Sequence, residues 1–120
     1  MNKNLRILII TPVKHIENLK KKFNFFNKIK IIENPTYNQV FREIDKFEVL
    51  FTNPNMSKVY IDEKLLKKGE NLKCVVTAST GTNHIDMDSL KKFKIKLISL
   101  TRDFRIINKI SSTAEHALAL

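Results

Sequence analysis

The segment TASTGTNHID (77–86) contains Gly81, one of only two glycines in the 120-residue chain, and directly follows the apolar run LKCVV. Successive backbone N–H groups in a glycine-containing turn can form a small concavity that binds anions. The segment therefore predicts a site in which the N–H groups of Thr80 and Gly81 hold a carboxylate or a phosphate. A lone glycine is equally typical of an ordinary strand-to-helix turn, and this alternative stays open.

The other side chains with chemical potential favour structural roles. The histidines, His15, His84 and His116, are scattered and do not show the spacing of a metal site. We expect His84 to be a turn residue and His116 to lie on a helix face, and neither to be a proton-transfer base. Cys74 lies within an apolar run, which favours an inert core thiol over a nucleophile. No catalytic residue and no metal ligand is assigned, and the nucleotide motifs GxxxxGK[ST] and GxGxxG are absent.

Short apolar runs alternate with amphipathic segments along the chain. The runs predict strands at 5–11, 29–32, 47–52, 72–78 and 95–100, and helices are expected at 14–27, 39–44, 62–69 and 87–94 and from residue 112 onward. This alternation indicates a parallel sheet covered on both faces. We predict an α/β fold, a flavodoxin-like doubly wound sheet of five parallel strands.

Several residues are suited to begin or end these helices. Asn38, Asp62 and Asp86 are expected N-caps, because their side chains can accept hydrogen bonds from free backbone N–H groups. Gly69 is placed to end the helix that Asp62 begins. Ser112 and Glu115 have the spacing of a capping box at the start of the last helix.

The composition bounds the possible partners. The net charge is +10, from 22 Lys and Arg against 12 Asp and Glu, and a basic balance can indicate nucleic-acid binding. Most of the excess is lysine spread over helices and turns, and in LKKKFNFFNKIK (19–30) we expect Phe23 and Phe26 to face a core rather than stack on bases. No apolar run is long enough for a signal peptide or a membrane span. We therefore expect a cytoplasmic chain without nucleic-acid or membrane partners.

Two linked motifs resemble a known family. VVTASTGTNHIDMDSLKKFKIKLISL followed by SSTAEHALAL resembles the substrate-binding domain of the D-isomer-specific 2-hydroxyacid dehydrogenases, the phosphoglycerate dehydrogenase-like family. That family shows a strand, a glycine-containing loop ending in N-x-[IV]-D, a helix, a strand and an [ST]-x-A-E helix start. The motifs cover residues 72–120, and residues 1–71 agree in the order of elements only.

The resemblance implies a two-domain oxidoreductase that exchanges a hydride between NAD or NADP and a 2-hydroxy or 2-oxo acid. It implies that Ser79, Thr80 and Gly81 bind the substrate carboxylate, that Asn53 and Pro54 line the substrate cleft, and that Thr80 and His116 lie near the cofactor.

The resemblance also implies which parts this chain lacks. The family's catalytic arginine, acidic residue and histidine, and its Rossmann nucleotide fingerprint, are expected beyond these 120 residues. Residues 1–110 are then the substrate-binding domain, and residues 111–120 begin the helix that leads to an NAD-binding domain. Alone, the chain is expected to be inactive and to bind no cofactor stably, and a homodimer is expected only for the full-length enzyme. The alternative is a non-catalytic, flavodoxin-like module that binds a small anion.

Overall fold

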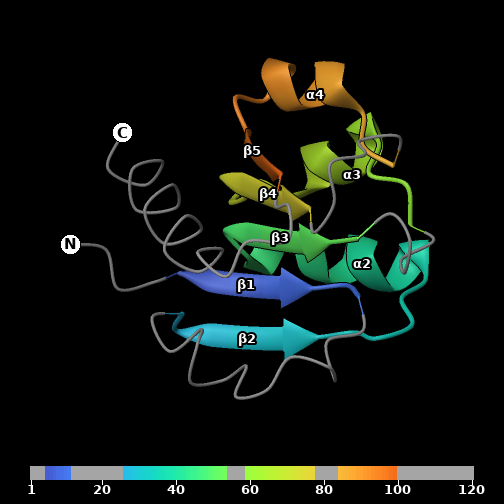
Figure 1. Ribbon diagram of the computed structural model, residues 1–120, viewed down its shortest axis with the longest axis vertical. Coiled ribbons are helices and arrows are strands. Elements are labelled where there is room, and N and C mark those ends of the chain that lie inside the picture. The colour runs from blue at the N-terminus through green and yellow to red at the C-terminus, as the bar shows by residue number, and fades with distance from the viewer. Residues whose placement is uncertain (1–4, 12–25, 54–58, 78–83, 100–120) are drawn as a thin grey trace.

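The computed structural model describes residues 5–11, 26–53, 59–77 and 84–99, and Figure 1 shows its ribbon. The strands are β1 (Arg6–Ile9), β2 (Lys28–Ile31), β3 (Val49–Thr52), β4 (Cys74–Thr77) and β5 (Lys96–Ser99). The helices of the described ranges are α2 (Tyr37–Glu43), the short 3-10 helix η1 (Ile44–Lys46), α3 (Glu63–Lys68) and α4 (Met87–Lys92). Each strand overlaps a predicted one but is only four residues long.

The strands form one parallel sheet in the order β2-β1-β3-β4-β5. This is the flavodoxin-like order, in which the chain moves outward from β1 to β2 and then returns to the other side of β1 to form β3, β4 and β5. The predicted fold class, an α/β fold with a five-stranded parallel sheet, is confirmed. The arrowheads in Figure 1 point the same way, so the carboxyl ends of the strands share one edge of the sheet.

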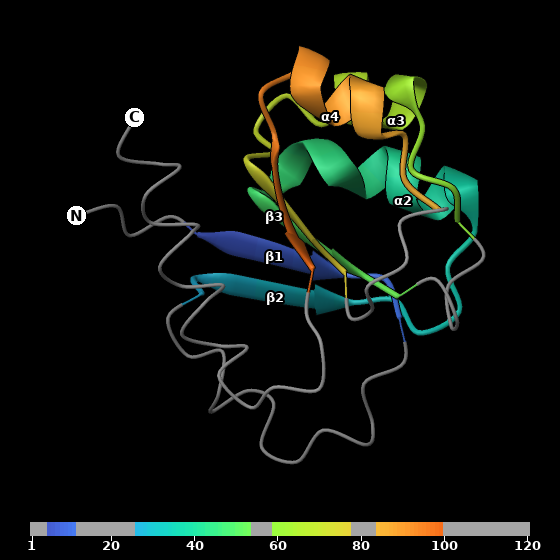
Figure 2. The same cartoon turned by 45° about the horizontal axis from the view of Figure 1, so that its top comes forward.

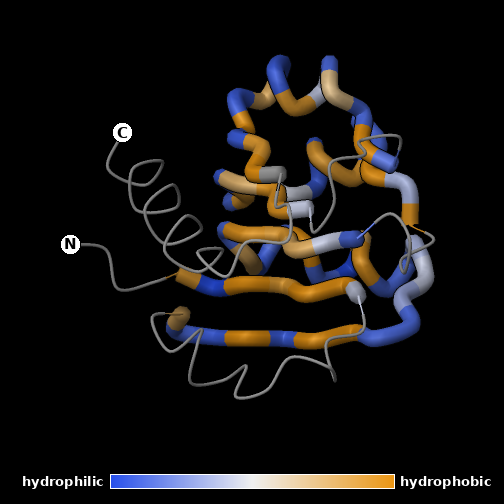
Figure 3. Tube along the Cα trace, in the orientation of Figure 1, coloured by the Kyte–Doolittle hydropathy of each residue, from blue (hydrophilic) through white to orange (hydrophobic). Residues whose placement is uncertain are grey.

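The central strands are buried on both faces. Successive side chains of a strand alternate between faces, and Ile7, Leu8, Ile9 and Ile10 all have an exposed fraction of 0%. A strand covered on both faces has a nearly continuous run of apolar residues in its sequence. Figure 3 shows such runs in β1, β3 and β4. The edge strand β2 alternates lysine with isoleucine and is partly exposed.

The described helices lie on the same face of the sheet (Figure 2). Each turns a narrow apolar stripe toward the strands, with Val40 in α2 and Leu65 and Leu66 in α3 at 0–1% exposure. The core cluster on this face consists of Leu8, Ile10, Val40, Ile44, Phe47, Leu50, Val59, Ile61, Leu65, Leu66, Leu72, Val75, Ile85, Leu90 and Ile95. Burial of this set holds the helices against the sheet and fixes where their N-termini lie.

Local hydrogen bonds set the helix boundaries. Asp62 and Asp86 cap α3 and α4 as predicted, and the N–H of Gly69 donates to the carbonyl of Leu65 where α3 ends. The prediction of Asn38 as the cap of the second helix is wrong. Thr36 is the cap, because Gln39 lies three residues after it and the two side chains bond each other's backbone N–H groups in a capping box.

One end of the predicted helix 14–27 also differs from expectation. Phe26 is buried at 6% exposure, as expected of a core residue, but Phe26 and Asn27 are not helical. The N–H of Asn27 donates to the carbonyl of Leu5 at 2.6 Å, and this bond starts the pairing of β2 with β1. The rest of that helix, and the capping box at Ser112 and Glu115, lie outside the described residues. In the described ranges, no helix combines the length and the apolar character needed to cross a bilayer.

Candidate functional site

Three strands end in the same way at the carboxyl edge of the sheet. Thr11 follows β1, while Thr52 and Thr77 are the last residues of β3 and β4. In an open α/β sheet, ligands bind at this edge, at the point where the strand order reverses, which here lies between β1 and β3. The sequence shows the pattern as three apolar runs that each close on threonine, IIT, LFT and VVT, a signal that our sequence interpretation did not use.

The threonine side chains at this edge are buried. The exposed fractions are 2% for Thr11 and 0% for Thr52 and Thr77. Thr52 and Thr77 are register partners in β3 and β4, so their side chains lie side by side on one face of the sheet. Among the described residues, the hydroxyls of Thr11 and Thr52 have no hydrogen-bond partner. A buried hydroxyl without a partner is costly, and such groups in native proteins are typical of places that hold a ligand or water.

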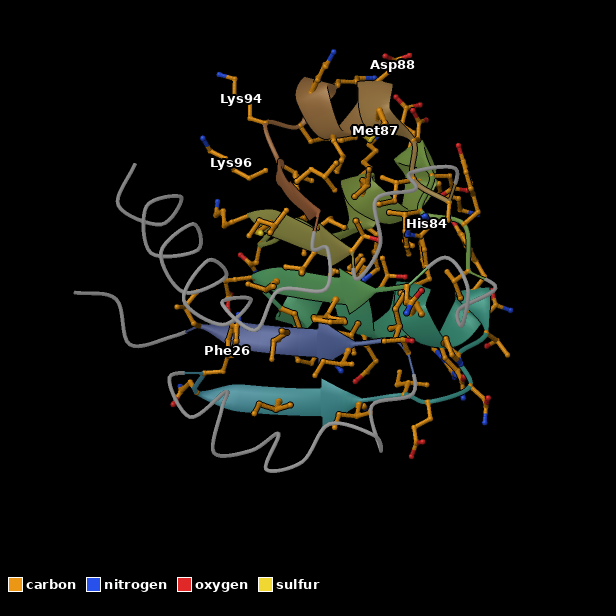
Figure 4. The ribbon with its side chains drawn as sticks, in the orientation of Figure 1. Phe26, His84, Met87, Asp88, Lys94 and Lys96 are labelled. Carbon is orange, nitrogen blue, oxygen red and sulfur yellow. The ribbon has the colours of Figure 1, made fainter. Side chains whose placement is uncertain are left out.

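His84 contacts the threonine at the end of β4. Its Nε2 lies 3.3 Å from Thr77 Oγ1, and the imidazole is only 8% exposed, at the position labelled in Figure 4. Burial lowers the pKa of His84 below its ordinary value of 6.5, so the ring is neutral at pH 7. Its Nδ1 has no hydrogen-bond partner in the described part of the chain. The expectation of a turn residue is confirmed, and the structure adds that this turn residue is buried.

The backbone around His84 is bound to the segment before α3. The N–H of Ile61 donates to the carbonyl of His84, and the N–H of Asp86 donates to the carbonyl of Ile61, both at 2.8 Å. Ile61 and Ile85 form an isolated parallel bridge, with exposed fractions of 0% and 4%. Residues 84–86 are therefore fixed by the core and by the sheet-like bonds to Ile61.

The carboxylates near this edge are used as helix caps. Asp62 accepts from the N–H of Leu65 at 2.9 Å and from the hydroxyl of Tyr37 at 2.7 Å. Burial, reinforced by this bond to Asp62, raises the pKa of Tyr37 to about 12. Asp86 accepts from the N–H and the hydroxyl of Ser89 at 3.3 and 2.8 Å, as expected of a structural cap. Both carboxylates already have structural partners.

The predicted substrate and cofactor residues are only partly described. Asn53 directly follows Thr52 at the carboxyl edge and is half-buried. Pro54, Ser79, Thr80, Gly81 and His116 lie outside the described residues. The described flanks, Thr77 and His84, show that the segment between them begins and ends at this edge of the sheet.

The remaining candidates have structural roles. Cys74 is fully buried in β4, and burial raises the pKa of its thiol to about 12, so the expectation of an inert core thiol is confirmed. Within the described ranges, no three or more His, Cys, Asp or Glu side chains gather as a metal site would require.

Known proteins resemble this chain in sequence. The sequence profile described as "D-isomer specific 2-hydroxyacid dehydrogenase, catalytic domain" matches residues 7–117. Formate dehydrogenase 1 of Saccharomyces cerevisiae is 31% identical over 78 residues, which cover 65% of this chain and 19% of the yeast protein. The chain spans half or less of the length of the curated relatives that it matches.

Solved structures share the fold. The PH0520 protein from Pyrococcus horikoshii OT3 superposes with a TM-score of 0.72 at 20% identity, covering 82% of this chain and 28% of that one. The NAD+-bound 3-phosphoglycerate dehydrogenase of Entamoeba histolytica gives a TM-score of 0.68 at 20% identity, covering 80% and 32%. In both cases the likeness extends over most of this chain and about a third of the other.

Proposed function

Because the chain belongs to the D-isomer specific 2-hydroxyacid dehydrogenase family, we propose that it is the substrate-binding part of an NAD-dependent oxidoreductase acting on the CH–OH group of a D-2-hydroxy acid. The observation that carries the proposal is the family match over residues 7–117, on a sheet with flavodoxin-like strand order. The buried polar groups at the carboxyl edge, where such sheets bind ligands, support it.

In this proposal, the substrate carboxylate is held by the backbone N–H groups of Thr80 and Gly81, with Ser79 beside them. Two adjacent N–H donors match the two oxygens of a carboxylate, and charge-assisted hydrogen bonds of this kind are about twice as strong as neutral ones. Asn53, which directly follows β3, and Pro54 are proposed to form the neighbouring wall of the site. The substrate would then lie across the carboxyl ends of β3 and β4, which are paired in register up to Thr52 and Thr77.

The proposed reaction is a two-electron oxidation of the hydroxy acid at C2. The C2–H bond of the hydroxy acid breaks and its electron pair leaves as hydride, while the hydroxyl proton passes to a base and C2 becomes a carbonyl. NAD, or NADP, supplies the hydride acceptor when bound, and Thr80 and His116 are the residues of this chain proposed to lie near it. The neutral, buried imidazole of His84 is hydrogen-bonded to Thr77 and is not the proposed base, which we place elsewhere in the protein.

Formate is a second candidate substrate, because the yeast relative is named a formate dehydrogenase. Formate has a carboxylate and a transferable hydride on a single carbon, so it needs the same pair of N–H donors but a smaller site. Its oxidation yields carbon dioxide and requires no hydroxyl proton acceptor. The two candidates therefore differ in whether a base is needed.

A kinetic assay of the full-length enzyme, of which this chain is the proposed substrate-binding part, tests the proposal. NADH and NADPH are offered with pyruvate and glyoxylate, and NAD+ is offered with D-lactate, D-glycerate and formate. We expect turnover with a 2-oxo or D-2-hydroxy acid, and an increase of about tenfold in KM when Gly81→Val crowds the proposed carboxylate site, which corresponds to about 1.4 kcal/mol. Thr82→Val, at the next position, is the control and should leave KM unchanged.

The outcomes separate the alternatives. Turnover with formate alone would replace the D-2-hydroxy acid by the second candidate. Absence of any NAD(H)- or NADP(H)-dependent turnover would overturn the oxidoreductase proposal and leave a small-anion-binding module.

A further inference from the structure

The contact between Thr77 and His84 joins the two ends of a six-residue connection, 78–83. Thr77 is held by the sheet, because β4 pairs with β3 on one side and with β5 on the other up to this residue. His84 is held by its backbone bond to Ile61. The two side chains come from different elements, and both are more than nine-tenths buried.

The hydrogen bond between Thr77 and His84 holds the two ends of this connection together. Fixing both ends of a short chain segment reduces the number of conformations that the residues between them can adopt. The bond is also buried, so water cannot replace either partner without opening the surrounding core. The second ring nitrogen, Nδ1, has no hydrogen-bond partner in the described ranges, so within them the imidazole is oriented by its bond to Thr77.

We propose that the hydrogen bond between Thr77 and His84 acts as a latch, and that both are positioning residues for the substrate carboxylate of the proposed reaction. This inference rests on the proposed function for its catalytic consequence, because Thr80 and Gly81 are the proposed carboxylate donors. Neither residue transfers a proton or touches the reacting atoms. Their effect is on the affinity for the acid.

Thr52 provides a matched control. It ends the neighbouring strand, is the register partner of Thr77, and is equally buried at 0% exposure. Among the described residues its hydroxyl has no hydrogen-bond partner, whereas that of Thr77 bonds His84. Thr77→Val and Thr52→Val therefore each remove a hydroxyl from the same depth and the same face of the sheet. Only Thr77→Val also removes the hydrogen bond to His84.

Hydrogen exchange tests the latch on this chain without any substrate. The reporters are the N–H groups of Ile61 and Asp86, which bond the carbonyls of His84 and Ile61. We expect Thr77→Val to speed their exchange about tenfold relative to the unaltered chain, Thr52→Val to leave it unchanged, and Thr77→Ser, which keeps the hydroxyl, to restore it. Equal exchange in the Thr77→Val and Thr52→Val chains would overturn the latch.

Kinetics of the full-length enzyme, of which this chain is the proposed substrate-binding part, test the positioning role. With pyruvate and NADH, Thr77→Val should raise KM about tenfold and change kcat less than about twofold, as expected when binding rather than chemistry is impaired. Thr77→Ser should recover KM. A fall in kcat at constant KM, or a raised KM that Thr77→Ser does not recover, would overturn it. If the unaltered protein reduces no 2-oxo acid, the proposed function and the positioning role both fail, and the latch is decided by hydrogen exchange alone.

Discussion

At the amino edge of the sheet the buried carboxylate of Glu48 is paired through both oxygens, whereas at the carboxyl edge several buried polar groups of the described residues have no partner. Glu48, at 7% exposure, accepts from the backbone N–H of Arg6 at 2.8 Å and from two guanidinium nitrogens at 3.1 and 2.6 Å. Its carbonyl accepts from the N–H groups of Lys73 and Cys74. At the opposite edge, the described atoms Thr11 Oγ1, Thr52 Oγ1 and His84 Nδ1 are buried without a partner.

This difference separates polar groups that stabilise the fold from groups available to a ligand. Glu48 joins β1 to the start of β4 through six hydrogen bonds and has little capacity left. The unpartnered hydroxyls at the other edge lower stability in the free chain, a cost that proteins commonly accept at functional sites. The carboxyl edge is therefore the better candidate for binding.

The largest effect is expected from Glu48→Ala at the amino edge. The variant leaves the Arg6 guanidinium without its carboxylate, and because Arg6 is one-third exposed we expect a loss of about 2–3 kcal/mol in the free energy of unfolding. Urea denaturation of the chain measures it. Glu63→Ala, which removes the exposed pair with Lys92, is the control and should cost less than about 1 kcal/mol. Equal losses in the two variants would contradict the contrast.

An intermediate effect is expected from Asp62→Ala at the carboxyl edge. This carboxylate does have partners, since it caps α3 and accepts from Tyr37, so its loss should cost about 1–2 kcal/mol. Asp62→Asn keeps an amide oxygen that can cap the helix and should cost less. Urea denaturation again provides the measurement, and an equally damaging Asn variant would show that charge, rather than the cap, is responsible.

The smallest effect concerns pH. Because burial lowers the pKa of His84 in the folded chain below 6.5, the unfolded chain takes up a proton more readily. The contribution of His84 to stability is complete above pH 6.5 and is lost as the pH falls through the lower, folded-state pKa. We expect the free energy of unfolding to fall less between pH 8 and pH 5.5 in His84→Gln than in the unaltered chain. His15 and His116 are common to both, so identical pH profiles would mean that His84 makes no such contribution.

Features set by neighbouring residues were predicted well from the sequence. Asp62, Gly69 and Asp86 were placed correctly at helix ends, because a cap depends on residues three or four positions away. Asn38 was wrong because Thr36, two residues earlier, also has a capping side chain, and Gln39 at the third helical position decides between them. The parallel, flavodoxin-like sheet was predicted from the alternation of elements and the preference for right-handed crossovers.

Features that depend on distant partners were not predicted. Whether a threonine at the end of a strand is buried depends on the register of the next strand, as for Thr52 against Thr77. The contact of His84 with Thr77 likewise requires the bridge between Ile61 and Ile85, which no local pattern shows. The candidate site was therefore located in the sequence by its loop, while the buried groups next to it were identified only in the folded chain.

The pairing of β1 with β3 has a consequence for biosynthesis. Arg6 and Glu48 are 42 residues apart in the chain, so the first strand has no central neighbour until β3 has left the ribosome. At a synthesis rate of about 5–20 residues per second, that interval lasts roughly 2–8 seconds. During it, the apolar run LRILII has only the edge strand β2 to pair with, and its β3 side is exposed to other nascent chains. Chaperones that bind short apolar segments would have their best target in this run, before the sheet exists.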